Sequence, residues 1–562
     1  SSCSMRSAAA ELGVIVGQGF FSLGEAPKGE AALRAAVARA DRAFGRGHPI
    51  TLQAKALLVE SLGFRDLALA ERLLAELVPD ALAGLPATAQ GAVFGLRSQA
   101  WVLAMREQPQ ASYAAARRAI EIGEQQLGPG HADTIRTLGL LATIQGRFGA
   151  HREQLATATE ARSRAEAAYG ARRPHPILTG IERWYGEALL HNGRPADAVP
   201  VLDRALREQR SLDAAETSRV LQALLLLADA TADSGRLSEA LPLMREGVAL
   251  DARLRGPAPS AHEAGAGMRL VALLMHLRRA DEALALCRVL VPIPLSEVQR
   301  PTRWRLQAEV HRARLLALRG DDTARRVAAD AADGAGDAHP AVRAEARLAM
   351  ALDARLQGRP AESLELMQRV LADPGASEFP QGLLADAHAE AASAWLDLGD
   401  SERAAQALER SRALFAAVQI GPTLRLSDMI VGEARVHLQS GRATQAEALL
   451  RPLVAAWRDA DPGSDWHGQS LHWLARAQAM RGGTSEALAN RRAAANLLHF
   501  GAADEPHHRV RIRGTVLAAL ADGRVFVRDA TPPPPPRDAK VDEPLLSPSI
   551  AIQLSSTSSL QT

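Results

Sequence analysis

Short polar turns separate alanine-rich amphipathic stretches along most of this chain. The turn usually contains a glycine, and small and large apolar residues follow it at helical spacing, as in NGRPADAVPVL from Asn192 and SGRATQAEALL from Ser440. Apolar residues three and four positions apart lie on one face of a helix. The pattern therefore predicts a long series of short helices joined by tight turns.

The turn recurs with a regular period. Twelve copies align on an anchor position; the anchors span 458 residues in eleven intervals of 38 to 47 residues, with a mean near 42. Glycine at ten of the anchors allows a left-handed backbone, so that a second helix can fold back antiparallel to the first. The anchors are Gly24, Gly63, Glu107, Gly146, Gly193, Gly235, Arg278, Gly320, Gly358, Gly399, Gly441 and Gly482.

Side-chain size at fixed offsets supports the same unit. Seven residues before the anchor, eleven of the twelve copies have Gly or Ala, and Val271 is the exception. Five residues after it, ten of the twelve have Ala, Gly or Ser, and the exceptions are His151 and Arg325. Nine residues after it, a large apolar residue such as Leu202 or Met244 is common. Small residues at these offsets allow the two helices of a pair to approach closely.

This arrangement over residues 5–500 resembles the tetratricopeptide repeat. The long period, with Gly/His-Pro loops at His48, His131, His175 and His339, looks like the kinesin-light-chain subtype found in C-terminal regions of bacterial Ser/Thr kinases. The resemblance implies an all-α, right-handed superhelical solenoid of about 12 antiparallel helix pairs. It also implies binding of protein or peptide partners in a superhelical groove.

The chain is expected to have four parts. Residues 5–250 and 251–505 would be N-terminal and C-terminal repeats, divided at a Pro-rich linker. Residues 506–529 would form a closing helix or hairpin that caps the last apolar face. Residues 530–562, which begin with a proline run and end rich in Ser and Thr, are expected to be disordered because they bury too little apolar surface.

Composition removes several classes of partner. The 66 basic and 64 acidic residues give a net charge of +2, so no strong field favours nucleic acid, and none is expected as a partner. No stretch approaches the 18 consecutive apolar residues of a membrane helix, and we expect no membrane insertion. Two cysteines, Cys3 and Cys287, are too few for a disulfide framework.

The common catalytic signatures are absent from the sequence. It contains no phosphate-binding GxxxxGK[ST], HRD, DFG, GxSxG or HExxH string, and GVIVGQG from Gly13 is interpreted as part of a core helix. His467 and His472 would lie about 140° apart on a helix, too far for one metal ion. We therefore expect no catalytic residue, no metal and no cofactor.

Binding is the remaining activity. Positions ten, six and three before each anchor are expected to face the groove lined by the first helices. An excess of arginine there would suit an acidic peptide or a C-terminal carboxylate. The alternative is an ordinary solvated face. The candidate groove residues are Arg97, Trp101, Arg136, Arg183, Glu187, Asp229, Arg314, Arg355, Arg435, His472 and Arg476.

The sequence thus predicts a non-catalytic protein-interaction scaffold. The alternative is the C-terminal sensor or docking region of a bacterial Ser/Thr protein kinase or transcriptional activator. The absence of an initiator methionine at Ser1 motivates that alternative. The expected location is the cytoplasm, or the periplasm if a membrane helix precedes residue 1.

Overall fold

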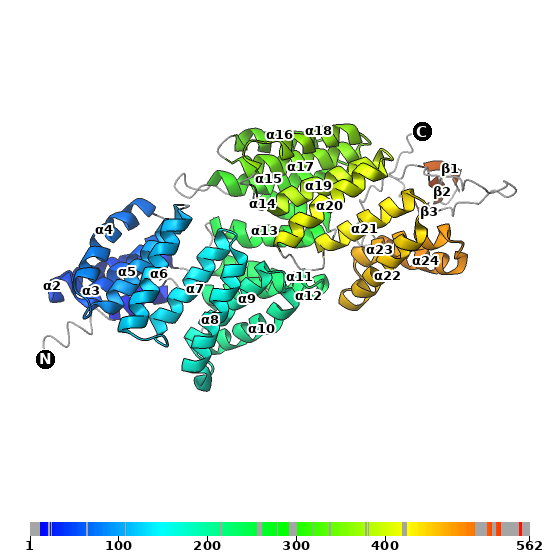
Figure 1. The fold of residues 1–562 in the computed structure, drawn as a ribbon. Helices are drawn as coiled ribbons and strands as arrows, with labels where there is room; N and C mark the ends of the chain where they lie inside the picture. The colour runs from blue at the N-terminus through cyan, green and yellow to red at the C-terminus, as the bar shows by residue number, and fades with distance from the viewer. Residues whose placement is uncertain are drawn as a thin grey trace. The chain divides into compact units, whose positions relative to one another are not determined.

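The computed structural model describes most of the repeat region and three strands near the C-terminus (Figure 1). The described residues are 12–20, 23, 25–62, 66–106, 108–213, 216–255, 261–277, 279–290, 301–318, 320–336, 339–376, 379, 381–418, 424–500, 514–519, 524–529 and 550–553. The anchors Gly24, Gly63, Glu107 and Arg278 fall outside them.

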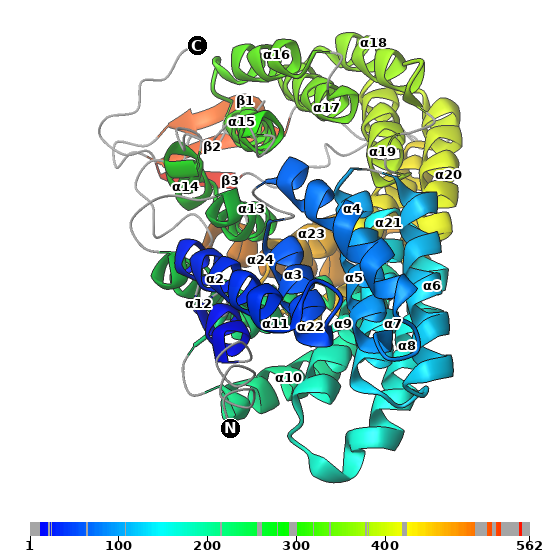
Figure 2. The same cartoon turned by 90° about the vertical axis from the view of Figure 1, so that its left-hand side faces the viewer.

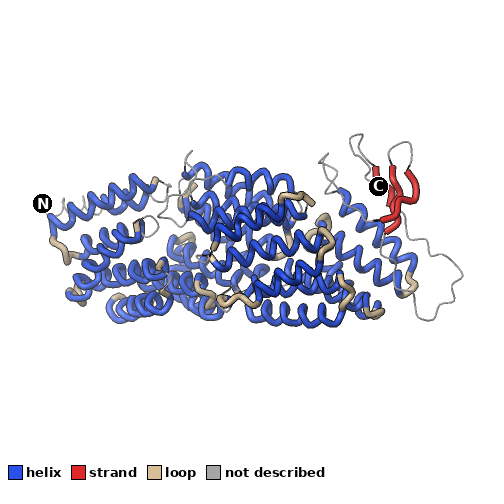
Figure 3. Tube along the Cα trace, turned by 90° about the horizontal axis from the view of Figure 1, so that it is seen from above, coloured by secondary structure: helices blue, strands red, loops and turns tan. Residues whose placement is uncertain are grey.

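Helices follow one another in antiparallel pairs, as expected (Figures 1 and 3). Residues 12–20 form the first helix of the first pair, which confirms that Gly13 and Gly17 lie on a helix. Through the sixth pair the helices are α2 (Ala26–Phe44), α3 (Pro49–Leu62), α4 (Leu67–Ala83), α5 (Ala89–Met105), α6 (Pro109–Gln126), α7 (Ala132–Arg147), α8 (His151–Tyr169), α9 (Pro176–His191), α10 (Pro195–Leu212), α11 (Ser218–Asp233) and α12 (Leu237–Arg255). A short 3-10 turn, η1 (Gly170–Arg172), follows α8.

Six further pairs complete the repeat region, so twelve pairs are described in all. They are α13 (Ala261–His276) with α14 (Ala280–Leu290), α15 (Pro301–Leu318) with α16 (Ala324–Ala335), α17 (Pro340–Leu356) with α18 (Pro360–Leu371), α19 (Gln381–Asp397) with α20 (Ser401–Val418), α21 (Leu424–Gln439) with α22 (Ala443–Ala460), and α23 (Asp465–Met480) with α24 (Thr484–Phe500).

The turn inside each pair explains the recurring glycine. A positive φ is found at the predicted anchors Gly193, Gly235, Gly320, Gly358, Gly399, Gly441 and Gly482. In the fourth pair, however, the positive φ belongs to Gly149, whereas Gly146 lies within α7. The register predicted there is wrong by three residues. Gln154 and Ala158 are the buried second-helix residues, in place of His151 and Leu155.

A smaller shift occurs in the second pair. The predicted small residue Ala68 is exposed, and the fully buried alanine is Ala70. The reason is that Asp66 caps α4 by accepting a hydrogen bond from the Leu69 N–H, which starts the helix two residues later than the anchor Gly63 implies.

The histidines of the Gly/His-Pro loops start three of the first helices. The Nδ1 atoms of His48, His131 and His175 accept hydrogen bonds from the backbone N–H two residues later, at 3.2 to 3.3 Å. The imidazole thus satisfies a free N–H at the helix start in the way an Asn or Asp N-cap would. Proline follows at the first helical position in α3 and α9, where no hydrogen-bond donor is needed.

Small residues bring the two helices of each pair together. Ala228 and Ala240, at the two predicted small positions of the sixth pair, are fully buried. At Gly186 an added Cβ would come within 2.5 Å of the Leu202 side chain. The predicted large positions Leu202, Met244 and others are also buried, so the alternation of small and large residues builds the core between helices.

Neighbouring pairs pack through the first helix of the later pair. From α5 to α23, each first helix contacts both helices of the pair before it, whereas the described second helices of successive pairs have marginal contact at most. Second helices are therefore spaced apart along the array, and Figure 2 shows the pairs following one another.

One contact joins pairs that are far apart in the chain. Ser238 at the start of α12 bonds to Asp461 after α22, and the Trp466 indole N–H donates to the His276 carbonyl at 3.1 Å. Trp457 and Trp466 stack with ring centroids 6.0 Å apart. Trp457 and Trp466 belong to one hydrophobic cluster that extends from the sixth pair to the twelfth.

The C-terminal residues form a separate unit, Ala502–Thr562, whose described part is a small antiparallel sheet. Strand β1 (Gly514–Ala519) pairs with β2 (Arg524–Asp529), which is the hairpin alternative predicted for 506–529. Strand β3 (Ile550–Gln553) also pairs with β2. This strand was not predicted, since residues 530–562 were expected to be disordered. The rest of that segment lies outside the described residues.

Candidate functional site

The predicted groove residues lie on the first helices, on the face that we name the first-helix face. It consists of the side chains about six residues before each turn and those one helical turn on either side. Most of them are half-buried, and Arg136 and His472 are exposed. The structure groups them into separate clusters along the face.

Arg97 and Arg136 share one buried carboxylate. Arg97 on α5 is only 8% exposed, lies 3.8 Å from Asp133 and stacks over the Phe94 ring at 4.5 Å. Arg136 lies 3.6 Å from the same Asp133, which also accepts a hydrogen bond from Gln90 at 2.9 Å. Arg97 is therefore part of the packing between α5 and α7. Trp101, on the next turn of α5, is half-buried.

A second cluster lies on α9, α11 and α13. Arg183 stacks over the neighbouring Trp184 at 5.4 Å, and burial lowers the pKa of Arg183 against the opposing effect of Glu187. Asp229 pairs with Arg269 on the next first helix. Burial raises the pKa of Asp229, and Arg269 offsets part of that increase. The Asp229 carboxylate is thus already committed to a neighbouring repeat.

Arg314 on α15 lies near the half-buried His311. Burial, followed by the positive charges of Arg314 and His276, lowers the pKa of His311 to about 4. His311 is therefore neutral at pH 7. The described residues include no ion-pair partner of Arg314.

The longest cluster crosses four first helices. The Arg355 guanidinium on α17 donates to Glu390 at 2.6 Å and lies 3.5 Å from Asp397, both on α19. Asp397 also accepts from Arg435 on α21 at 3.0 Å. Burial by itself would lower the pKa of Arg355, but the nearby carboxylates of Glu390 and Asp397 have the larger effect and raise this pKa. These alternating charges connect successive repeats.

The end of this ladder is the Trp473 cluster, which we define as Asp397, Arg435, His472, Trp473 and Arg476. Arg435 and Arg476 each place a guanidinium carbon 5.4 Å from the centre of the Trp473 ring, and His472 meets its edge at 5.5 Å. Burial lowers the pKa of Arg435, and Arg355 and Arg476 add to this effect. Among the described residues, Arg476 has no carboxylate partner. The cluster thus combines an aromatic surface with an uncompensated cation.

Sequence reasoning missed the carboxylates that pair with the predicted arginines. Asp133, Glu390 and Asp397 were not among the candidates, and neither were Trp473 and Arg269. A signal was present, because the paired residues are 35 to 42 positions apart, which is about one repeat. Opposite charges one period apart on the same helical face would have identified them.

The histidines singled out as possible metal ligands do not form a ligand set. His467 is nearly buried, and its Nδ1 lies 2.8 Å from the Pro462 carbonyl, while His472 points to Trp473. Across the part of the chain that is described, no three His, Cys, Asp or Glu side chains are placed to hold a metal ion. None of the described helices is both long and apolar enough to span a bilayer.

The repeated antiparallel pair, the left-handed turn residue and the two small contact positions define the class. This chain is a tetratricopeptide-like α-solenoid. No family model and no curated protein sequence matches it. The kinesin-light-chain subtype therefore stays a prediction.

Solved structures with similar helix arrangements have low sequence identity. The apo form of the quorum sensor NprR from B. thuringiensis is 15% identical, with a TM-score of 0.46, over 65% of this chain and 98% of that one. A Rap protein complexed with Competence and Sporulation Factor is 14% identical, with a TM-score of 0.46, over 66% and 99%. TPR-like repeats of a putative kinesin light chain from Podosopora anserina are 20% identical, with a TM-score of 0.30, over 37% and 97%.

Proposed function

We propose that this protein is a non-catalytic interaction scaffold that binds an acidic protein or peptide segment along its first-helix face. The observation that carries the proposal is the Trp473 cluster. Its two guanidiniums flank one indole, and Arg476 lacks a carboxylate partner among the described residues. A guanidinium forms bidentate hydrogen bonds with a carboxylate, and the indole supplies apolar contact area next to it.

The ladder that ends at this cluster keeps the site in position. Arg435 is held by Asp397, which is held in turn by Arg355, so the orientation of Arg435 over Trp473 is set before a ligand arrives. Less side-chain ordering is then needed on binding. The proposed roles are carboxylate binding for Arg476, apolar contact for Trp473 and positioning for Arg435.

A peptide-display selection tests this proposal. Random peptides would be selected on the full chain and on variants Arg476→Glu and Trp473→Ala. The matched control is Arg458→Glu on the second helix α22, where the arginine is 64% exposed and pairs with its neighbour Asp459. We expect wild type and the control to enrich peptides with Asp or Glu beside an apolar residue, and Arg476→Glu to enrich them less strongly. Equal enrichment by Arg476→Glu would refute binding at this site.

A further inference from the structure

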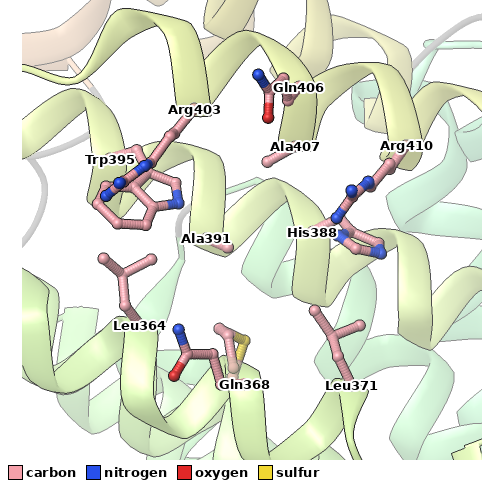
Figure 4. A pocket seen from close by; sticks show the side chains of 11 residues that line it. Leu364, Gln368, Leu371, His388, Ala391, Trp395, Arg403, Gln406, Ala407 and Arg410 are labelled. Carbon is pink, nitrogen blue, oxygen red and sulfur yellow. The ribbon is translucent and has the colours of Figure 1, made fainter.

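A pocket lies between the second helices α18 and α20, next to α19 (Figure 4). Its volume is about 250 Å³. Trp395 and Ala391 of α19 form its floor, and α18 and α20 supply its walls. The pocket exists because second helices of successive pairs are held apart, which leaves part of α19 uncovered between them.

The walls are apolar, and the rim is cationic. Leu364, Met367, Leu371 and Ala407 complete the apolar lining, and no Asp or Glu lines the pocket. Arg403 stacks over Trp395 at 4.7 Å and lies 3.5 Å from Asp400.

Arg410 lies at the other end of the pocket, beside His388 (Figure 4). Burial lowers the pKa of His388, and the charge of Arg410 lowers it further. Arg410 has no ion-pair partner among the described residues. The pocket therefore carries two cations, of which at least Arg410 is uncompensated.

In two other gaps, an ion pair joins the second helices. Arg245 and Glu282 join α12 to α14 at 2.6 Å, and Arg451 and Glu486 join α22 to α24 at 3.2 Å. In each pair the arginine lies ten residues after one anchor and the glutamate four residues after the next.

In the α18–α20 gap these two positions hold Gln368 and Arg403. Gln368 and Arg403 cannot form such an ion pair, and Arg403 leaves positive charge at the opening of an apolar pocket. A partner that supplies carboxylates would balance this positive charge.

We propose that the α18–α20 pocket binds one large apolar side chain, of leucine or phenylalanine size, presented by an acidic segment of a partner protein. The apolar side chain would occupy the space above Trp395, and flanking carboxylates would pair with Arg403 and Arg410. The volume lies below the range of about 300–1,000 Å³ typical of small-molecule sites, which favours a single side chain over a larger cofactor.

Fluorescence anisotropy with a labelled peptide EDLFED and the full chain tests the proposal. Two companion peptides separate the contributions: QNLFQN removes the charges, and EDAAED removes the apolar side chains. We expect EDLFED to bind about tenfold more tightly than either companion. No binding of EDLFED up to about 1 mM, or equal affinity for QNLFQN, would overturn the proposal.

Variants place the bound peptide. Arg410→Glu on the exposed rim should weaken EDLFED about tenfold, and Ala407→Phe should fill the pocket and weaken it similarly. Arg369→Glu on α18, which is exposed but does not line the pocket, is the matched control and should bind as wild type does.

Arg476→Glu separates this site from the Trp473 cluster, which would also bind carboxylates beside an apolar residue. In the Arg476→Glu background EDLFED should still bind, and adding Arg410→Glu should weaken that binding about tenfold. Loss of binding in Arg476→Glu, with full binding in Arg410→Glu, would overturn the pocket proposal while supporting the first-helix face. Circular dichroism of every variant checks that the helices are intact.

Discussion

Ser238 donates to the Asp461 carboxylate through both its backbone N–H, at 3.1 Å, and its hydroxyl, at 3.0 Å, across 223 residues of chain. Helix repeats normally contact only their neighbours, so their stabilities add nearly independently. Here the start of α12 and the turn between α22 and α23 are joined directly. The stabilities of the sixth and twelfth pairs should therefore be coupled.

Asp461→Ala should destabilise both ends of that contact. Asp461 is 5% exposed, and its replacement removes the charged acceptor of two hydrogen bonds from Ser238, at a cost of about 1–3 kcal/mol. Hydrogen exchange of peptides from α12, α22 and α23 should increase together. Asp459→Ala, at a 70% exposed position of the same helix, is the control. An increase confined to α22 and α23 would show that the contact does not couple the stability of α12 to theirs.

Glu182 is the centre of a buried charge network on α9. The carboxylate is fully buried and accepts hydrogen bonds from Arg173 at 2.9 Å and Arg204 at 2.6 Å. Glu182→Gln removes the carboxylate that pairs with Arg204, while Arg173 keeps its ion pairs with Glu166 and Glu208, and stability should fall by about 2–3 kcal/mol. Urea unfolding at pH 7 measures the change. An unaltered midpoint would mean that solvent replaces the carboxylate without loss.

The same variant predicts a pH dependence. Burial opposes ionisation of Glu182, but the hydrogen bonds from Arg173 and Arg204 outweigh it and hold its pKa below the ordinary value. A lowered carboxyl pKa stabilises the fold above the unfolded pKa of about 4.3, and this stabilisation is lost as the pH falls through the folded pKa. The stability difference between wild type and Glu182→Gln should therefore narrow below about pH 4.

His311 should make the protein less stable in mild acid. Its folded pKa is about 4, lowered by burial and by Arg314 and His276, whereas the unfolded value is about 6.5. Between these values the unfolded chain binds a proton that the folded chain does not, so stability falls as the pH drops from about 6.5 to about 4. In thermal melts, His311→Gln should reduce this dependence of stability on pH between about 4 and 6.5. Above pH 7 the substitution should not change how stability varies with pH.

Cys287 should be unreactive while the protein is folded. The thiol is fully buried on α14, and burial raises its pKa to about 12, with Glu309 adding to the effect. Because the thiolate is the nucleophile, alkylation at pH 8 should be slow in buffer and fast in denaturant. Peptide mass spectrometry reports the modification at Cys287 itself. Rapid labelling in buffer would indicate that α14 opens readily.

Two glycines of the fourth and fifth pairs should respond to alanine in opposite ways. Gly149 has φ +77°, which an alanine adopts only with strain, so Gly149→Ala should destabilise by about 1 kcal/mol. Gly180 lies on helix α9 with open space around its Cα, so Gly180→Ala should stabilise by about 0.5–1 kcal/mol. Denaturation midpoints of the two variants test the assignment. A loss in Gly180→Ala would contradict the open environment described here.

The sequence could predict the helix pairs because their determinants are local. All of them lie within about 20 residues of one anchor: the turn residue, a small residue on each side of it and a large apolar residue nine positions later. Where two glycines lie close together, as in Gly146 and Gly149, local sequence allowed either to take the turn. Packing places the turn at Gly149, because Gln154 and Ala158 are then the residues that pack against α7.

The sequence by itself determined the class of fold, the number of helix pairs and the positions that form the first-helix face. Only the tertiary structure decided which arginines on that face are neutralised, because their partners Asp397 and Asp133 come from a neighbouring repeat. It also decided which gap between second helices contains a pocket. It also decided the contact of Ser238 with Asp461. The physical reason is that periodicity arises within one repeat, whereas these pairings depend on how neighbouring repeats are placed and on rotations that accumulate over several of them.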